Sequence, residues 1–463
     1  MKKKSSTSGE IVFLLVSPIH VRNYIETGVL KDVAKTHNCF FLCPDTLKLP
    51  PNFTRDHKVI HFRPIGHSQH RFVFNLMMFV NRKKSSTFDF RIKRSYFPKK
   101  TDYSNQQQSG KYYVIFLAKR TKKLIKWAFM CFATAPVLRE LLPSLLIRLI
   151  PENAKLEDII ARIGPDLTIM PSSAYEPDGM ELVRICQKLK IKSMFIIDNW
   201  DNLSSKTVIY RKPDAISVWG QQTVDHAIKI QGIQKEKIET LGTPRFDQYF
   251  ILRNTNLSSR FSFKYILFVG TVLEFDEYSA LEAMNSILES SKLENGMRIV
   301  YRPHPWRQSK GTIDLDHLEH VILDPQIEEA YQTGDKLFQP PLEYYPSLLK
   351  NAEFVMGGLT TMLIEALIFY KPFLAITWND ERLSTNMRDV HDNYSHFREL
   401  GKVDLVFFNK ERASLSSDFK KIWKSRENIN KESHDKQLKY FYTCTEKTFS
   451  DRLLNVIPEI IKK

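Results

Sequence analysis

The stretch from Glu353 to Thr377 constrains the fold of this chain more than any other feature. An apolar run leads into Gly357-Gly358, a helix-forming segment follows, and a second apolar run, Pro372 to Thr377, completes the pattern. Strand, glycine turn, helix and strand form an α/β unit, whose turn lies at the carboxyl end of a strand, where open parallel sheets bind ligands. Glycines let a ligand approach the backbone, and the free N–H groups at a helix start attract phosphate. We therefore predict an anion-binding turn, with an acid within reach of an adjacent ribose, formed by Gly357, Gly358, Thr360, Thr361 and Glu365.

A second polar turn follows another strand of the same half. Arg298 to Tyr301 is predicted as a strand, and it ends in Arg302-Pro303-His304-Pro305. Arginine forks match phosphate oxygens bidentately, so Arg302 and His304 are predicted to help bind the anion. The alternative is a loop stiffened by two prolines, with its arginines in solvent.

Strands and helices alternate along both halves of the 463 residues, which indicates parallel sheets. The first series runs from Ile11 to Leu241 and the second begins at Tyr265, with the polar segment Asn254 to Phe263 between them. We predict an α/β fold of two doubly wound sheets. The predicted domains are residues 1–253, residues 254–440, and a terminal helix, 441–463, that could cross back to the first domain.

Positive charge is concentrated in one segment. Residues 71–148 contain seventeen lysines and arginines against Asp89, Asp102 and Glu140, so they carry +14 of the net +16. Aromatic residues occur throughout; Tyr112 to Phe132 is predicted as a helix, and 101–110 as a flexible loop. Such a mixture suits an anionic membrane surface, an amphipathic helix packed on its own domain, or nucleic acid. We favour the membrane surface for this mostly helical insertion, 71–150, and place nucleic acid last.

The termini and cysteines bear on location. No secretory signal is evident in the first residues, and no apolar run is long enough to span a bilayer. The five cysteines match no zinc-binding or redox spacing. We expect a cytoplasmic protein, peripheral at the inner face of the cell membrane.

The motif order within Ile266 to Ile376 resembles the CDP-glycerol glycerophosphotransferase and surface-carbohydrate glycosyltransferase group. The shared features are the Arg-x-His-Pro strand end, a helix before a short strand, a glycine-rich turn and a Lys-Pro pair, which are here Arg302 to Pro305, Tyr345 to Lys350, Gly357 to Thr361 and Lys371-Pro372. The segment Gly357 to Ala366 is also similar to UDP-GlcNAc 2-epimerase. Gly-Gly-Leu-Thr-Thr stands where the glycerophosphotransferases usually have an acidic-serine turn, which favours a nucleotide sugar over CDP-glycerol.

The resemblance implies a GT-B fold, two Rossmann-like domains facing across a cleft, the second of which binds the donor. Arg302 and His304 would face the donor diphosphate, the Gly358–Thr361 turn would cradle it, and Glu365 would bind the ribose. No metal or cofactor is implied, because helix dipole, arginine and hydroxyl donors neutralise the leaving nucleotide. The implied activity is transfer of a sugar to a surface polysaccharide or lipid-linked glycan. Alternatives are a UDP-sugar 2-epimerase, a glycerophosphotransferase using CDP-glycerol, and a non-catalytic nucleotide-sugar-binding protein.

Inverting transfer needs a base for the acceptor hydroxyl. Candidates follow strands of the first half: His20 after the first strand, Glu176 and Asp178 after the strand ending at Met170, and Asp198 and Asp201 after the strand ending at Ile197. Helix capping and an Asx-turn network are the structural alternatives for these side chains. Trp200, between the last two acids, suits a sugar ring. Arg245 is predicted either to touch donor or acceptor or to form part of a hinge.

Overall fold

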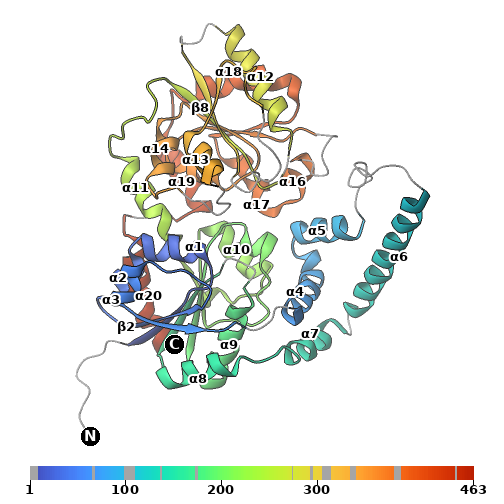
Figure 1. The fold of residues 1–463 in the computed structure, drawn as a ribbon, viewed down its shortest axis with the longest axis vertical. Coiled ribbons are helices and arrows are strands. Elements are labelled where there is room, and N and C mark those ends of the chain that lie inside the picture. Colours follow the sequence, from blue (N-terminus) through green and yellow to red (C-terminus); the bar gives the residue numbers. More distant parts are fainter. Residues whose placement is uncertain are drawn as a thin grey trace. The chain divides into compact units, whose positions relative to one another are not determined.

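The computed structural model describes residues 9–64, 68–97, 110–135, 138–172, 176–273, 275–291, 296–304, 314–333, 340–379, 387–443 and 446–463. The chain divides into two compact units, each built around one parallel sheet (Figure 1). The described parts of 9–97, 110–245 and 440–463 form the first unit, and those of 246–439 form the second.

The first unit contains a seven-stranded sheet in the order β3-β2-β1-β4-β5-β6-β7, with every neighbouring pair parallel. The strands are β1 (Glu10–Leu14), β2 (Asn38–Pro44), β3 (Lys58–Phe62), β4 (Leu167–Ser172), β5 (Lys192–Ile197), β6 (Ala215–Val218) and β7 (Ile238–Thr240). Helices cover both faces, so the central strands β1 and β4 are buried on both sides and are mostly apolar. On β1, Ile11 and Phe13 join one core, and Val12 and Leu14 join the other.

One core of this sheet includes a helix from the end of the chain. Helix α20 (Phe449–Lys462) contributes Leu453 and Ile457 to the core that α2 (Val29–Ala34) and α3 (Pro51–Asp56) also line. The opposite core is lined by α8 (Ala154–Ile163), α9 (Pro177–Leu189) and α10 (Gln221–Lys229). Residues 440–463 thus complete the hydrophobic core of the first unit.

The second unit contains a six-stranded parallel sheet in the order β10-β9-β8-β11-β12-β13. Its strands are β8 (Tyr265–Val269), β9 (Arg298–Arg302), β10 (Val321–Leu323), β11 (Val355–Gly357), β12 (Phe373–Ile376) and β13 (Val406–Asn409). Its helices are α11 (Asp247–Arg253), α12 (Glu277–Ser290), α13 (Pro325–Thr333), α14 (Tyr344–Asn351), α15 (Met362–Ile368), α16 (Met387–Asn393), α17 (Ser395–Arg398), α18 (Leu415–Ser425) and most of α19 (Lys431–Phe441). The predicted α/β class with two doubly wound sheets is confirmed.

One predicted boundary differs from the observed one. The units divide between Arg245 and Phe246, before the expected boundary at 253, because α11 belongs to the second unit through the contact of Tyr249 with Phe369.

The insertion between β3 and β4 is helical, as predicted, and has a small core of its own. It consists of α4 (Ser68–Val80), η2 (Asn81–Lys83), α5 (Ser86–Tyr96), α6 (Gly110–Ala133) and α7 (Leu138–Arg148), with the long helix α6 on the outside of the unit (Figure 1). Its core includes Phe79, Phe88 and Met130, together with Val208 and Ile230 from the sheet region. The expected flexible loop lies outside the described residues except for Gly110. Within the described chain, no helix has the length and apolarity needed to cross a membrane.

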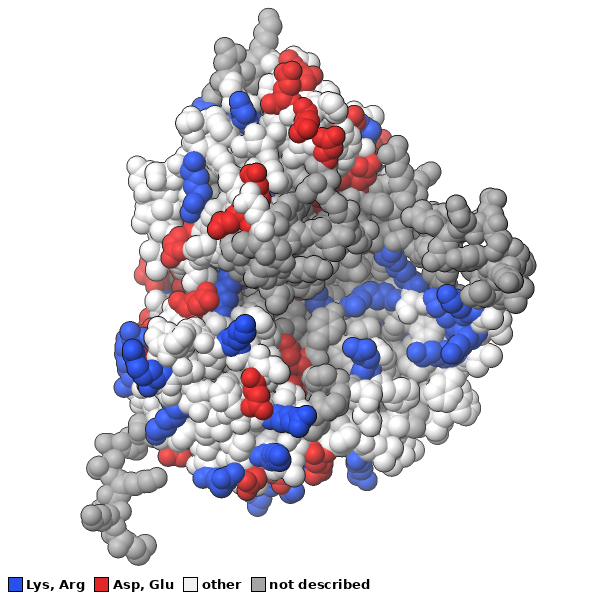
Figure 2. All heavy atoms as spheres, in the orientation of Figure 1, with Lys and Arg blue, Asp and Glu red and all other residues white. Residues whose placement is uncertain are grey.

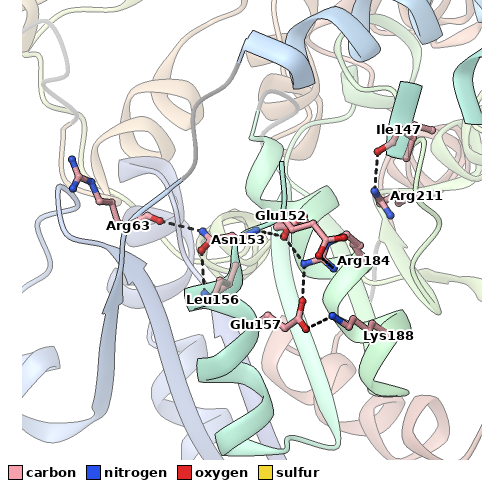
Figure 3. Close-up of polar contacts among 10 residues, drawn as sticks. Arg63, Ile147, Glu152, Asn153, Leu156, Glu157, Arg184, Lys188 and Arg211 are labelled. Atoms are coloured by element: carbon pink, nitrogen blue, oxygen red, sulfur yellow. Dashed lines mark hydrogen bonds and ion pairs between the residues drawn. The ribbon is translucent and has the colours of Figure 1, made fainter. Parts of the chain in front are cut away.

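A buried ionic cluster joins the end of the insertion to α8 and α9 (Figure 3). Arg184 donates to Glu181 at 2.9 Å from Nε and to Glu157 at 2.9 Å from Nη2. Asn153 caps α8 by accepting the N–H of Leu156, and its own N–H donates to Glu181. The cluster fixes where the chain leaves the insertion and re-enters the sheet.

Candidate functional site

Three turns meet at the carboxyl edge of the second sheet. Strand β8 lies between β9 and β11, so the turns that follow these strands, Gly270-Thr271, Pro303-His304 and Gly357-Gly358, are neighbours. The chain builds β9 and β10 on one side of β8 and β11 to β13 on the other. The turns therefore occupy the point of strand-order reversal, where open α/β sheets bind ligands.

Glycine is required at this edge because the turns touch. A Cβ on Gly270 would lie 2.8 Å from the backbone nitrogen of His304, and one on Gly358 would lie 2.7 Å from Cγ2 of Thr271. Gly357 has φ 147°, which favours glycine, and a Cβ there would overlap the carbonyl oxygen of Val269. The two turns predicted to bind the anion thus lie on the same edge, with the Gly270 turn between them.

Arg302 ends β9 directly before the predicted turn, and its side chain contacts several protein groups. Its guanidinium is 3% exposed, forms an ion pair with Asp324, and donates to Gln326 and, at 3.0 Å, to the hydroxyl of Tyr345. Burial alone would lower the pKa of Arg302, but Tyr345 and Asp324 raise it above its usual value. The guanidinium therefore stays charged and secures the end of β9 against the residue that follows β10. His304 remains half-buried at the edge of the turn.

The turn before α15 presents hydroxyls rather than a long helix dipole. Helix α15 has 7 residues, so its macrodipole is short. Thr360 and Thr361 are half-buried in the turn. Glu365 is buried inside α15, and its Oε2 accepts a hydrogen bond of 2.8 Å from Tyr249 on α11. Tyr249 therefore orients the carboxylate that was predicted to bind ribose.

A second polar cluster lies at the carboxyl edge of the first sheet. His20 follows β1 and Asp198 follows β5, and their side chains meet with 3.3 Å between Nε2 and Oδ2. The hydroxyl of Tyr24 donates to the other oxygen, Oδ1, of Asp198 at 2.9 Å. All three side chains are fully buried. The strands thus bring two of the predicted catalytic residues into contact and add a tyrosine.

Hydrogen-bond directions assign a role to His20. The N–H of Val16 donates to Nδ1 of His20 at 3.2 Å, so Nε2 carries a proton and donates to Asp198. Burial, and then the charge of Asp198, raise the pKa of Tyr24 well above its usual value, so the phenol keeps its proton. His20 and Tyr24 therefore hold Asp198 in place. A role of His20 as the base for an acceptor hydroxyl stays a prediction.

Two π-helical segments border this cluster, η1 (Val21–Glu26) and η4 (Asn202–Lys206). Such segments are rare and occur frequently at functional sites. Oδ1 of Asn23 and Oδ1 of Asn202 are both buried and have no hydrogen-bond partner within the described chain. Unsatisfied buried polar atoms are uncommon in folded proteins.

The other predicted residues of the first unit have different surroundings. Asp201 pairs with Lys206 at 2.9 Å, and Asp178 is 5% exposed in the first turn of α9. Glu176 is half-buried at the start of that helix, with no side-chain cap bond. Trp200 is buried against Phe441, so it offers no open face to a sugar, contrary to the expectation. Arg245 lies over the Trp219 ring, 5.6 Å from its centroid.

Sequence reasoning missed Tyr24, Tyr249, Glu277 and Asp324. Glu277, buried at the start of α12, accepts from the backbone of Thr271 at 3.3 Å and from Tyr301 at 2.6 Å. Asp324 directly follows β10, and Tyr24 follows His20 by one helical turn. Both residues could therefore have been identified from their positions near a strand end or near another candidate. Tyr249 carried none, because its contact with Glu365 spans 116 residues. Among the described residues, no group of His, Cys, Asp or Glu is placed to hold a metal ion.

No protein-family model matches the chain, and no curated protein matches it. Among solved structures, it is similar to UDP-GlcNAc 2-epimerase from Methanocaldococcus jannaschii, with 12% identity, 97% of this chain and 99% of that chain covered, and a TM-score of 0.51. It is also similar to a glycosyltransferase from Rickettsia africae, with 9% identity, 99% and 100% coverage, and a TM-score of 0.51. UDP-GlcNAc 2-epimerase from Neisseria meningitidis, bound to UDP-GlcNAc, gives 10% identity, 97% and 100% coverage, and a TM-score of 0.51.

These similarities identify the fold as GT-B, with two Rossmann-like units. The resemblance is thus supported at the level of the GT-B fold, whereas the CDP-glycerol group is not singled out. At such low identity the similarity concerns the fold alone.

Proposed function

We propose that this chain is a glycosyltransferase that moves a sugar from a nucleotide-sugar donor to a surface polysaccharide or lipid-linked glycan, without a metal or cofactor. The observation that carries the proposal is the meeting of three turns at the strand-order reversal of the second sheet, with glycines where they touch. The Neisseria epimerase of the same fold binds UDP-GlcNAc, which supports a nucleotide sugar as the donor.

The second unit is the proposed donor unit. The backbone at Gly357 and Gly358 and the hydroxyls of Thr360 and Thr361 would receive the diphosphate, with His304 beside them. Glu365, oriented by Tyr249, would bind the ribose hydroxyls. Arg302 is a positioning residue here, because its donors are engaged by Asp324, Gln326 and Tyr345.

The first unit is the proposed acceptor unit, and Glu176 is the proposed base. Asp198 is held on both oxygens, Asp201 is paired with Lys206, and Asp178 is buried. Glu176 is half-buried at the carboxyl edge, where a carboxylate can accept a proton from an acceptor hydroxyl. The Asp198 cluster would shape the neighbouring pocket. Arg245 could contact donor or acceptor.

The test is a thermal-shift screen of the full chain against nucleotides and nucleotide sugars, followed by a transfer assay with the donor that stabilises it. A bound donor raises the melting temperature by mass action. We expect a uridine or other nucleoside diphosphate sugar to raise the melting temperature, and Glu176→Gln to abolish transfer while keeping that shift. The absence of a shift with every nucleotide would contradict the proposal and favour a protein with a degenerate site.

A second candidate is a UDP-sugar 2-epimerase, which the two epimerases of the same fold favour. An enzyme acting on free nucleotide sugar has no need of the basic insertion, so we prefer the transferase. Incubation with UDP-GlcNAc, followed by NMR, separates the two, because only an epimerase produces the 2-epimer without an acceptor. Including CDP-glycerol in the screen tests the glycerophosphotransferase alternative.

We propose a membrane location for the protein together with the acceptor class. A polysaccharide or lipid-linked acceptor is assembled at a membrane, and the segregated positive charge supports a peripheral position at its inner face.

A further inference from the structure

We propose that the outward face of α6 is a docking surface for an anionic lipid bilayer. This inference deepens the proposed function and rests on it for its biological meaning, since it names the surface by which the enzyme would reach a membrane acceptor.

The inner face of α6 fixes the rotation of the helix. Trp127 packs on Phe79 with 5.2 Å between ring centroids and on Tyr96 with 5.4 Å. Met130 and Ala133 are buried in the insertion core. With Trp127, Met130 and Ala133 turned inward, the opposite side of the helix must face outward.

That opposite side is apolar. Ile125, Phe129 and Phe132 recur at positions i, i+4 and i+7, so they form one stripe. Their exposed fractions are 66%, 54% and 69%, although an ordinary surface helix directs such side chains to the core. The inner face of α6 is already packed on the insertion core, so the exposed apolar stripe on its outer face indicates an interaction surface.

The stripe is flanked by positive charge. Lys122 and Lys126 precede Ile125 and Phe129 by three residues each, so they lie beside the stripe, and both are exposed. Helix α6 contains no acidic residue. On the face shown in Figure 2, Lys and Arg gather over the helices of the insertion. Helix α7 and the residue after it add a further exposed row, Leu141, Leu145 and Leu149.

This combination fits an anionic bilayer better than other partners. Apolar side chains of an interfacial helix enter the boundary between headgroups and acyl chains, while lysines meet anionic headgroups. A nucleic acid would satisfy the lysines and leave the Ile125 and Phe129 stripe in water. A second copy of the chain would bring like charges together, because α6 has no acid to pair with them. Since no described helix can cross a membrane, α6 would lie on the surface.

The experiment measures flotation of the full chain with vesicles of phosphatidylcholine alone or with about 30% phosphatidylserine. We expect binding to the anionic vesicles only, and at least about a tenfold loss at high salt. Ile125→Glu and the double variant Lys122→Glu/Lys126→Glu should each reduce partitioning by about tenfold or more. Both changes are at exposed positions, and an unchanged melting temperature verifies that the variants fold.

Matched controls lie outside the insertion. The side chain of Ile251 on α11 is 61% exposed, a fraction similar to the 66% of Ile125. Ile251→Glu should therefore bind vesicles like the wild type. Lys420 and Lys424 on α18 are exposed and have the spacing of Lys122 and Lys126, so Lys420→Glu/Lys424→Glu should lose little binding.

The inference is overturned if Ile125→Glu floats like the wild type or if neutral vesicles bind equally well. It is also overturned if the charge reversals reduce binding to a duplex RNA or DNA probe but not to vesicles. A dimer in sedimentation that Ile125→Glu dissociates would assign the stripe to a second copy instead. No donor is present in the flotation assay, so its failure is separate from a failure of the donor screen.

Discussion

At the scale of single residues, the two candidate sites depend on buried acids held by partners far away in sequence. Asp198 is fixed by His20 and Tyr24, and Glu365 is fixed by Tyr249. A carboxylate without water needs such donors, because an unpaired buried charge is costly. The donors therefore determine where each carboxylate oxygen points and which oxygens remain for a ligand.

Removing the phenol that holds Asp198 should destabilise the first unit. Tyr24→Phe deletes a buried hydrogen bond to a charged group, and we expect a loss of roughly 1.5–3 kcal/mol. Urea unfolding followed through the first unit measures this free energy. Tyr278→Phe is the control, because Tyr278 on α12 is half-buried and its hydroxyl has no hydrogen bond within the described chain. Equal effects of the two substitutions would contradict the assigned role of Tyr24.

A methyl group at Gly270 should disrupt the proposed donor site. Its Cβ would meet backbone atoms of Pro303 and His304 at 2.9 and 2.8 Å, so the turns must separate. We expect Gly270→Ala to weaken donor binding by about tenfold or more, as measured by isothermal titration calorimetry. Gly401→Ala is the control in the same unit, since the nearest atom to its Cβ is 3.7 Å away, on Phe408. Wild-type affinity in Gly270→Ala would argue against this edge as the donor site.

At the scale of elements, short irregular segments bring the polar residues together. The π-helical segments η1 and η4 follow strands β1 and β5 and place Tyr24 and Asn202 beside Asp198 and Ser172. Elsewhere in the first unit, the Arg184 cluster ties α8 to α9. Both arrangements join helices and strands whose contacts are not predicted by local secondary-structure propensity.

Breaking the Arg184 cluster should cost stability in a pH-dependent manner. Arg184→Met leaves Glu181, 2% exposed, without its cation, and we expect a loss of about 3–5 kcal/mol at neutral pH. Hydrogen bonds from Lys188 and then from Arg184 lower the pKa of Glu157. The ionised Glu157 side chain therefore stabilises the fold above the usual glutamate pKa, and this stabilisation is lost as pH falls through the lowered pKa.

The difference between wild type and Arg184→Met should therefore shrink below roughly pH 4.3, as urea titrations at several pH values would show. Arg162→Met on α8 is the control, because its pair with Asp158 is exposed on both sides and contributes little. A difference that stays constant from neutral to acid pH would refute the ionic explanation.

At the scale of the whole molecule, the chain leaves the first unit, builds the second and returns. Helix α20 fills the first unit's core with Phe449, Leu453, Ile457 and Ile460. The return is held by Tyr442, whose hydroxyl accepts from the N–H of Thr243 at 3.2 Å. A Cβ on Gly242 would overlap that tyrosine ring, so the glycine makes room for the crossing.

Truncating a core side chain in α20 should therefore destabilise the first unit, although most of that unit is far from α20 in sequence. Leu453→Ala should lower the stability of the first unit by about 2–5 kcal/mol and leave the second unchanged. Hydrogen exchange monitored by mass spectrometry assigns the loss to residues 9–245 or 246–439. Asn455→Ala, exposed on the same helix, should have little effect. Faster exchange confined to the second unit would contradict the observed packing.

The sequence by itself determined the elements and their order along the chain. The strand predicted from Arg298 to Tyr301 is observed as β9 (Arg298–Arg302), and the glycine turns follow the strands where the pattern placed them, because apolar periodicity and glycine act locally. Strand β13 was missed, since its four residues, Val406–Asn409, offer little pattern.

Only the tertiary structure decided which side chains meet. It paired Arg302 with Asp324, buried Trp200 and His20, and turned the apolar stripe of α6 outward. Tyr24 and Asp198 are 174 residues apart, and α20 packs against strands from the beginning of the chain. Such contacts follow from strand order and from the burial of helix faces, and neither is encoded in the local spacing of residues.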